Sequence, residues 1–460
     1  MSDELCFLSC AELAEGYRQG ALSPVEVARA VLERIERVNP RVNALYFVDH
    51  EGALAAARDA EARWARGAPL SELDGIPVTL KDSIPVAGMP MPLGTLARAG
   101  RVSGGADAPA TMRLREAGAV LLGKTTMPDL GMIASGISSA HGVTRNPWDL
   151  GRNTGGSSSG AGAAVAAGLG ALAVGSDIGG SVRIPAAFCG IVGLKPSYGR
   201  VPLADPWQAL VAGPMARTVG DVARMLKLIA RPDARDYSAL PWDDRDYLAG
   251  IDDGVRGLRV GLLEDVGFGI AVQPQVLALV RAAATLFEAL GASVEMMTPI
   301  FENDPEPHFD RMVQAHAWAD FCTLSAQEKN GVLPEVAAWC REGAGLNAAE
   351  LTRATVAIGD IRRRVIDATL PYDLVLTPTM AVEAFPAEQP WPVGGSRHNP
   401  FCFPFSLSEQ PALSICCGLT TSGLPVGLQI VGRRFDDVRV LRAAHAYEAA
   451  RAPLPAWPVL

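Results

Sequence analysis

"NTGGSSSGAGAAVAAGLGALAVGSDIGGSVRIPAAFCG", residues 153–190, has a serine-bearing glycine turn at each end of a segment rich in alanine and glycine. Residues 153–176 carry no charge and are long enough to suggest a membrane span. The stretch opens with polar residues and glycines, however, and the rest is mostly Ala and Gly, which favours a buried helix. The turns have three interpretations: a flexible linker, a phosphate cradle or a hydrolase site.

The composition indicates a globular protein. The 460 residues exceed the usual size of a single core, although large α/β enzymes can form one piece. Hydrophobic residues make up 49% and charged residues 20%, which is enough apolar material to offset the entropy of the unfolded chain. The eight cysteines form no CxxC pair, so we expect reduced, mostly buried thiols.

The charge pattern argues against two classes of partner. The net charge is -9, and no basic block with interleaved aromatic residues is present, so nucleic acid is not expected to bind. Asp3 and Glu4 stand where a secretory signal would be basic, and no apolar core follows them. We expect a cytoplasmic protein that binds small molecules and not a membrane.

Hydrophobic periodicity predicts an α/β fold. The run "GIPVTLKD" predicts a strand that carries Lys81 at its carboxyl end. A strand, a helix and a second strand over residues 257–297 are typical of parallel pairing, whereas "LSICCGLTTSGLPVGLQIVGRR" predicts a hairpin. We expect a mixed, mainly parallel β-sheet core covered by helices on both faces.

No clean linker divides the chain, so we expect a single domain over residues 1–460. Within it, residues 1–68 are predicted to be helical and residues 69–205 to form the catalytic core. Residues 300–400 have the weakest pattern and several scattered aromatic residues, and we interpret them as a lid or a substrate-specificity region.

The segment "GAVLLGKT", residues 118–125, matches the nucleotide-binding pattern G-x-x-x-x-G-K-[ST]. A phosphate cradle needs a loop whose N–H groups surround an anion, whereas the four residues between the glycines have the composition of a strand interior. We therefore interpret Lys124 as a strand-end residue, with nucleotide binding as the weakest alternative.

Residues 156–160, "GSSSG", match the G-x-S-x-G elbow of α/β-hydrolases, which would make Ser158 the nucleophile. The histidine that such a site needs is available downstream at His308, His316, His398 or His445. An elbow follows an apolar strand, however, and a polar turn precedes this motif. The histidines also lack the spacing of zinc ligands, so no metal is expected.

The second turn offers a different nucleophile. Two glycines before Ser181 allow successive N–H groups to face one concavity, which can serve as an oxyanion hole. Ordinary turn chemistry explains Gly-Gly-Ser equally well. A serine needs a base, and Lys81 suits that task if apolar neighbours such as Val78 and Leu80 lower its pKa.

Six stretches occur together in a fixed order: "GIPVTLKD", "AGAVLLGKT", "HGVTRNPW", "GGSSSGAGAAVAAG", "GSDIGGSVRIPAAFCGIVGLKPSYGRV" and "GLPVGLQIVG". In them the chain resembles the amidase signature enzymes, densely over residues 70–205 and more loosely over residues 400–450. The resemblance implies the amidase signature fold and a triad without cofactor. Its members would be Ser181 as nucleophile, Ser157 after a cis peptide bond, and Lys81 as base.

The resemblance also implies the residues around the triad. The oxyanion hole would be formed by the backbone N–H groups of Ile178, Gly179, Gly180 and Ser181. Supporting positions match Ser158, Asp177 and Arg183. The chain departs from the pattern at Ser159, where the family usually has glycine, and at Thr154, where proline is common; an extra side chain at position 159 would crowd or stiffen the turn.

Uncharged loops that the resemblance places near the pocket suggest the substrate. Met91, Gly131, Met132, Ile133 and Trp207 are candidate contacts for a bulky aryl or alkyl group, although a core role has equal weight. We expect hydrolysis of hydrophobic amides or carbamates (urethanes) by a monomer or homodimer. The alternative is the glutamine-hydrolysing subunit of a tRNA amidotransferase, whose usual Arg-Gln-Pro reads Arg183-Ile184-Pro185 here.

Overall fold

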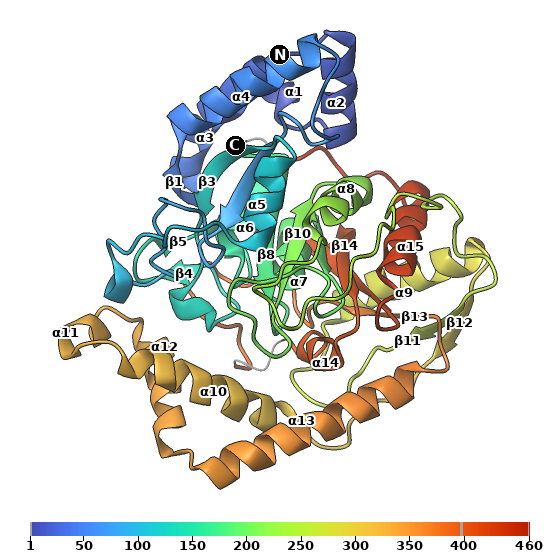
Figure 1. Ribbon diagram of the computed structural model, residues 1–460. Helices are drawn as coiled ribbons and strands as arrows, with labels where there is room; N and C mark the ends of the chain where they lie inside the picture. Colours follow the sequence, from blue (N-terminus) through green and yellow to red (C-terminus); the bar gives the residue numbers. More distant parts are fainter. Residues whose placement is uncertain (1, 396–398, 459) are drawn as a thin grey trace.

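An 11-stranded sheet runs through the computed structural model, which describes residues 2–395, 399–458 and 460. The strand order is β1-β3-β2-β8-β10-β9-β14-β15-β13-β11-β12, and helices flank the sheet (Figure 1). The strands are β1 (Leu45–Val48), β2 (Pro77–Lys81), β3 (Val120–Thr125), β8 (Leu172–Asp177), β9 (Val192–Lys195), β10 (Val211–Ala216), β11 (Arg259–Leu262), β12 (Ser293–Met296), β13 (Leu374–Pro378), β14 (Ala412–Leu419) and β15 (Pro425–Gly432).

Two small ribbons lie outside this sheet: β4 (Ile137–Ser138) with β5 (Gly142–Val143), and β6 (Arg145–Asn146) with β7 (Asp149–Asn153). The helices are α1 (Ser2–Leu5), α2 (Cys10–Gln19), α3 (Pro24–Val42), α4 (His50–Ala65), α5 (Pro109–Glu116), α6 (Ser159–Ala166), α7 (Arg183–Cys189), α8 (Val219–Ile229), α9 (Pro274–Ala289), α10 (Glu306–Cys322), α11 (Ala326–Lys329), α12 (Pro334–Glu342), α13 (Ala348–Thr369), α14 (Phe403–Leu407) and α15 (Asp437–Ala450). Short 3-10 turns occupy Leu96–Arg98, Asp129–Gly131 and Gly343–Gly345.

The sheet is mixed as predicted, but parallel pairs do not predominate. Parallel pairing is confined to β3-β2-β8 and β13-β11-β12, and every other neighbouring pair is antiparallel. A parallel pair needs a crossover connection, which α5 supplies between β2 and β3 and α9 supplies between β11 and β12. The predicted hairpin is β14-β15, which turns at Gly423 with φ +76°.

The buried helix predicted from residue 153 to 176 is a helix followed by a strand. Helix α6 ends near Ala167, and Gly168 and Gly170 adopt φ +70° and +148° before strand β8 begins. A fully buried strand and a buried helix have the same apolar composition, so periodicity does not distinguish them over so short a stretch. No described helix is long and apolar enough to cross a membrane.

Small side chains let the central elements approach closely. A Cβ on Gly160 would lie 2.2 Å from the carbonyl oxygen of Ala44, and one on Gly162 would lie 2.8 Å from the Cβ of Pro185 in α7. The alanine and glycine content of residues 153–190 is therefore a packing requirement, because it brings both serine turns against the same part of the sheet.

The N-terminal region is helical as expected, with local signals that explain its bounds. The Ser23 side chain accepts hydrogen bonds from the N–H groups of Val25 and Glu26 at the start of α3. The helix continues past Pro40 and ends at Val42, where the capping residue Asn43 adopts φ +51°. Strand β1 was not predicted, and it pairs antiparallel with β3 at the edge of the sheet.

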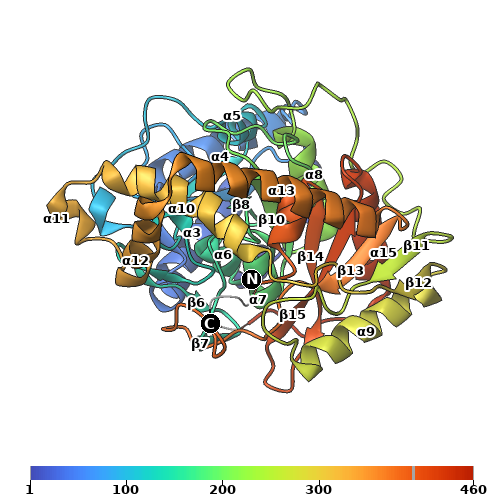
Figure 2. The same ribbon diagram turned by 90° about the horizontal axis from the view of Figure 1, so that it is seen from below.

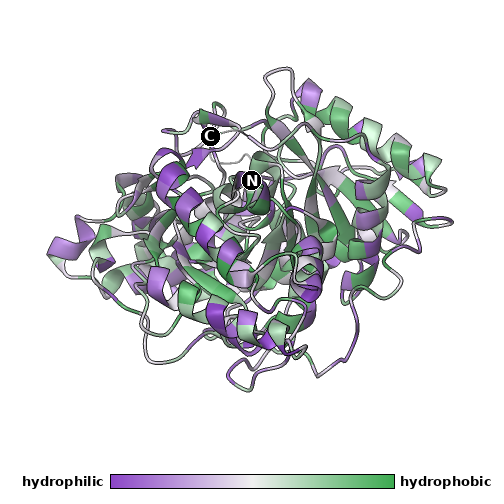
Figure 3. Cartoon of the chain, turned by 90° about the horizontal axis from the view of Figure 1, so that it is seen from above, coloured by the Kyte–Doolittle hydropathy of each residue, from purple (hydrophilic) through white to green (hydrophobic). Residues whose placement is uncertain are grey.

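Helices α10 to α13 form a cover below the sheet (Figures 1 and 2). Helices α10 and α12 share an apolar cluster that includes Ala317, Phe321, Val336 and Cys340. The buried face of α13 belongs to a second cluster, which also contains Val375 of β13. The region predicted as a lid is not uniform, because β13 returns to the main sheet beside β15. Hydropathy follows this arrangement: interior strands are mostly green, and the outer helices carry purple residues (Figure 3).

Candidate active site

Lys81 lies at the carboxyl end of β2, next to the parallel strand β8. Its Nζ is 2.8 Å from Ser157 Oγ and 2.9 Å from Ser176 Oγ. The side chain is buried, with 1% of its surface exposed. Because carboxyl ends of neighbouring parallel strands meet at one edge, β2 and β8 bring the lysine to the second glycine turn.

The surroundings of Lys81 favour its uncharged form. Burial lowers the pKa of Lys81 to about 7, and the negative charges of Asp177 and Asp82 act in the opposite direction. The amine is therefore substantially neutral near physiological pH. Burial among apolar neighbours was expected from the sequence to lower the pKa of Lys81, and the structure agrees with this expectation.

Ser157 follows a cis peptide bond between Gly156 and Ser157, as the resemblance implied. The glycines around it allow close packing. A Cβ on Gly156 would lie 2.6 Å from the backbone nitrogen of Ser135, and one on Gly131 would lie 3.4 Å from Ser157 Oγ. The first glycine turn thus places a hydroxyl directly against Lys81.

Ser181 lies in the second turn, half-buried, and its carbonyl oxygen accepts a hydrogen bond of 3.1 Å from the N–H of Ser158. This contact joins the two serine turns. Gly180 adopts φ +119°, and a Cβ there would lie 2.7 Å from the Cβ of Cys402, so only glycine fits. Ile178, Gly179 and Ser181 line the cavity described below.

One of the four expected oxyanion donors is already engaged. The N–H of Gly180 donates to Asp177 Oδ1 at 2.8 Å. No acceptor for the N–H groups of Ile178, Gly179 and Ser181 is found among the described residues. The carboxylate of Asp177 therefore holds the turn, and the other three N–H groups stay available at its surface.

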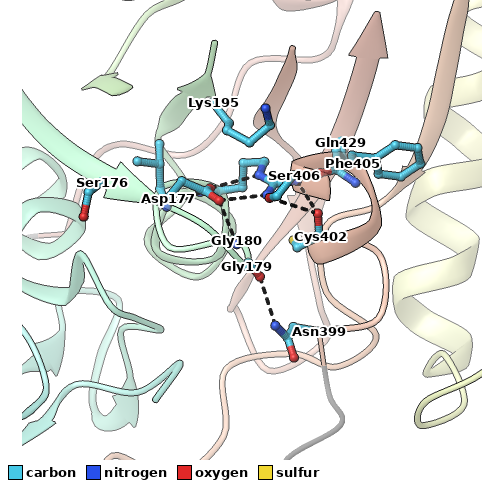
Figure 4. Close-up of polar contacts among 12 residues, drawn as sticks. Ser176, Asp177, Gly179, Gly180, Lys195, Asn399, Cys402, Phe405, Ser406 and Gln429 are labelled. Atoms are coloured by element: carbon cyan, nitrogen blue, oxygen red, sulfur yellow. Dashed lines mark hydrogen bonds and ion pairs between the residues drawn. The ribbon is translucent and has the colours of Figure 1, made fainter. Parts of the chain in front are cut away.

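Asp177, labelled in Figure 4, forms a fully buried ion pair with Arg183. Arg183 Nη2 donates to Asp177 Oδ1 at 2.8 Å, and Nε donates to Oδ2 at 3.0 Å. Burial would raise the pKa of Asp177, but the Arg183 charge and hydrogen bonds outweigh it and lower the pKa to about 2. The pair stays ionised and fixes the turn that carries the nucleophile candidate.

Distant segments complete this network. Arg183 Nη1 donates to Gln429 Oε1 at 2.7 Å and to the carbonyl of Cys402 at 3.0 Å, while Nη2 donates to Ser406 Oγ at 2.8 Å. Asn399 Nδ2 donates to the carbonyl of Gly179 at 3.0 Å (Figure 4). These contacts were not predicted, although Gln429 lies in the stretch "GLPVGLQIVG" that carries part of the resemblance.

Lys195, at the end of β9, is a second buried lysine that the sequence did not single out. Burial, with the nearby charge of Arg183, lowers its pKa to about 7. Its Nζ donates to the carbonyl oxygen of Pro196 at 3.1 Å.

A cavity of about 1140 Å³ opens above these groups. All five predicted substrate contacts, Met91, Gly131, Met132, Ile133 and Trp207, line it, together with Lys81, Ser157 and Ser181. The cover adds aromatic walls from Phe309 and Trp339. The Trp207 ring stacks on His316 of α10 with centroids 4.3 Å apart, so loop and cover meet at the cavity.

The serine elbow and the nucleotide-binding loop, the two alternative sites, do not have the structures that their motifs require. Ser158 Oγ donates to the carbonyl of Ser176 at 3.2 Å and accepts from its N–H at 3.3 Å, so this hydroxyl secures β8 rather than acting as an elbow nucleophile. Lys124 lies inside β3, where its Nζ donates to the carbonyls of Asp82 and Ile84. Its segment is a strand and not a phosphate loop.

His308, His316 and His445 make no hydrogen bond with a serine hydroxyl in the described part of the chain, and His398 lies outside the described residues. Residues 2–395, 399–458 and 460 contain no group of three or more His, Cys, Asp or Glu side chains suited to a metal ion.

Comparison with known proteins identifies the family. The family model described as Amidase matches residues 26–441. An acylamidase of Rhodococcus erythropolis is 36% identical, with 97% of this chain and 96% of that protein covered. A glutamyl-tRNA(Gln) amidotransferase subunit of Myxococcus xanthus (strain DK1622) is 38% identical over 97% of each chain.

Two solved structures extend the likeness to the whole fold. A bacterial aryl acylamidase of the amidase signature family superposes with a TM-score of 0.90 at 28% identity, covering 96% of both chains. The 6-aminohexanoate cyclic dimer hydrolase gives a TM-score of 0.87 at 28% identity over 97% of both. With a family match and relatives that span nearly its full length, the chain belongs to the amidase signature family and is an amidohydrolase acting on carbon–nitrogen bonds.

Proposed function

We propose that this protein hydrolyses hydrophobic small-molecule amides and carbamates through an acyl-enzyme on Ser181, with Lys81 as the base. The observation that carries the proposal is a buried amine with a pKa lowered to about 7, 2.8 Å from Ser157 Oγ, on the wall of the cavity that Ser181 lines. General bases work best when their pKa lies near the operating pH.

In the proposed mechanism, neutral Lys81 takes the proton of Ser157, and Ser157 takes the proton of Ser181. At the same time, Ser181 Oγ bonds to the substrate carbonyl carbon. When the tetrahedral intermediate collapses, its carbon–nitrogen bond breaks. The protonated lysine then returns the proton through Ser157 to the leaving amine. Water hydrolyses the ester on Ser181 by the same transfers, and the acid is released.

The oxyanion is proposed to bind the N–H groups of Ile178, Gly179 and Ser181. The Gly180 N–H is bonded to Asp177 and holds the loop in shape. Donors that are fixed before the reaction stabilise developing charge without reorganisation. We therefore assign Asp177 and Arg183 a supporting role, through the backbone they position.

The walls of the cavity favour a bulky apolar substrate. Methionine, isoleucine and tryptophan side chains line it, and its volume of about 1140 Å³ exceeds what a single amino acid fills. One relative is named an acylamidase, and one structural neighbour is an aryl acylamidase. Carbamates present the same carbonyl and an amine leaving group, so the same chemistry applies to them.

Glutamine hydrolysis is the second candidate, because the glutamyl-tRNA(Gln) amidotransferase relative is 38% identical over 97% of the chain. The apolar Ile184 lines the cavity beside Ser181, where a polar substrate such as glutamine gains no hydrogen bond from the side chain. This residue favours the amidase proposal.

The test is hydrolysis of an aryl amide, an aryl carbamate and glutamine by the purified chain alone, with Ser181→Ala as the control. We expect turnover of the aryl substrates, loss of at least about a hundredfold in the control, and no glutaminase activity. Glutaminase activity that appears only with an added partner protein, without aryl hydrolysis, would overturn the proposal.

A further inference from the structure

Lys81 has a second hydroxyl partner besides Ser157. Ser176 Oγ lies 2.9 Å from Lys81 Nζ, and the Ser176 carbonyl oxygen lies 3.4 Å from it. Both oxygens belong to the residue of β8 that directly precedes Asp177. The amine is thus surrounded by three oxygens, of which two belong to Ser176.

The Ser176 hydroxyl in turn contacts Ser83. The two Oγ atoms are 3.2 Å apart, and either can donate. Ser83 is half-buried, lies two residues after Lys81, and lines the cavity. A line of three polar groups therefore leads from the lysine to the cavity wall, separate from the one through Ser157.

The number of N–H groups on a neutral amine determines which of these groups donate and which accept. A neutral lysine has two N–H donors and one lone pair. The Ser176 carbonyl can only accept, so it takes one N–H. If the Ser176 hydroxyl donates its proton to Ser83, its oxygen takes the second N–H. The lone pair of Lys81 then faces Ser157 Oγ, the group whose proton it has to receive.

We propose that Ser176 is a positioning residue that fixes the lone pair of Lys81 toward Ser157, and that Ser83 orients the Ser176 hydroxyl for this task. The inference rests on the proposed role of Lys81 as base. Without Ser176 the amine is free to turn an N–H toward Ser157, and the proton transfer that activates Ser181 becomes rare.

The charged groups that act on Lys81 are Asp177 from β8 and Asp82 after β2, and substitution of Ser176 removes neither. The lost hydroxyl is an acceptor for the ammonium form. Its removal therefore destabilises the charged lysine and moves the pKa further down. A purely structural role of Ser176 would change stability without this shift.

The experiment measures the rate at which a fluorophosphonate inactivates the full chain, from about pH 5 to about pH 10. In this reaction Ser181 Oγ bonds to phosphorus, fluoride leaves, and the Ser181 proton passes to Ser157 and Lys81. The variants are Ser176→Ala, Ser176→Thr and Ser83→Ala. Ser159→Ala is the matched control, because among the described residues its hydroxyl bonds only to the carbonyl of Thr126, at 3.3 Å.

We expect Ser176→Ala to lower the limiting rate at high pH at least about tenfold and to move the midpoint to lower pH. Ser176→Thr, which keeps the hydroxyl, should retain both values. Ser83→Ala should shift both in the same direction by less, and Ser159→Ala should match the unmodified chain.

A rate and midpoint for Ser176→Ala equal to those of the unmodified chain would overturn the inference, as would equal impairment in Ser176→Thr. If Ser176→Ala does not fold by circular dichroism, the half-buried Ser83→Ala decides in its place: an unchanged rate and midpoint there overturn the inference. Inactivation of Ser181→Ala at the normal rate would instead refute the proposed function.

Discussion

At Lys81, burial acts against two nearby carboxylates. Burial lowers its pKa to about 7 although Asp177 and Asp82 raise it, so desolvation is the larger effect. A neutral amine donates through its two N–H groups and accepts through its one lone pair. Its hydroxyl partners here are Ser157 and Ser176. A lysine that would be an ordinary cation on the surface has a lowered pKa at the end of β2, as its proposed role as base requires.

The pH dependence of the reaction follows from this pKa. Because only neutral Lys81 can accept a proton, kcat/KM should rise with pH through about 7 and then level off. Lys81→Arg, which stays charged, should lose roughly a hundredfold to ten-thousandfold in kcat/KM. The measurement is kcat/KM for an aryl amide across this range.

Lys124→Met is the matched control for that profile. Burial also lowers the pKa of Lys124, to about 8, but within the described part of the chain its Nζ bonds to two backbone carbonyls and to no serine. Its midpoint should equal that of the unmodified chain. A flat profile between about pH 6 and about pH 10, with the chemical step limiting, contradicts Lys81 as the base.

Lys81 should also reduce stability below its ordinary pKa of 10.5. As the pH falls from 10.5 to about 7, the unfolded chain binds a proton that folded Lys81 does not, so the free energy of unfolding decreases. Lys81→Met should therefore raise the free energy of unfolding near pH 7, on the order of a few kcal/mol, with a smaller gain near pH 10. Urea unfolding at both pH values measures this, and a gain that grows with pH would be inconsistent with a neutral buried lysine.

At the scale of elements, the site depends on close packing of α6. A Cβ on Gly160 would meet the carbonyl of Ala44 and the N–H of Thr126 at 2.2 and 2.4 Å, and these backbone atoms cannot turn away. Gly160→Ala should lower the free energy of unfolding by roughly 1 to 3 kcal/mol or more.

Gly359→Ala is its counterpart in the exposed middle of α13, where a Cβ meets no atom within 4 Å. The change should raise the free energy of unfolding by about 0.5 to 1 kcal/mol, because alanine is the better helix former. Equal effects of the two substitutions in urea unfolding would mean that α6 is not packed as described.

The contact between the cavity loop and the cover should govern substrate size. Trp207 lines the cavity and stacks on His316 of α10. Trp207→Ala should raise KM for a bulky aryl amide at least about fivefold and change KM for a short aliphatic amide little. Trp242→Ala, at an exposed ring beside Arg231, is the control. A uniform rise in KM for both substrates would exclude Trp207 as a size-selective contact.

Over the whole molecule, the features that could be predicted best from the sequence are those that depend on neighbouring residues. The end of β2 at Lys81 and the two glycine turns could be recognised because strand pattern and turn residues mark them within a few positions. The partners of Arg183 could not be found in this way. Gln429 and Ser406 lie more than two hundred residues further along the chain and reach Arg183 only through the order of the strands.

Pairing direction was harder to predict than the presence of strands. β10 pairs antiparallel with both β8 and β9, although its short run of residues carries no hairpin signal toward either.

The Gly180 N–H was predicted as an oxyanion donor, and its bond to Asp177 appears only once the loop is folded. The assembly state, a monomer or homodimer, stays a prediction.

The central claim is a covalent intermediate on one hydroxyl. Rapid quenching of an aryl carbamate reaction, followed by mass spectrometry of the digested chain, tests it most directly. We predict one adduct on Ser181, the alkoxycarbonyl group that remains after the carbon–nitrogen bond breaks and the amine leaves, and we expect no adduct after Ser181→Ala substitution. An adduct on Ser157 or Ser158, or turnover with no adduct at any time point although product is released in a burst, would contradict the account.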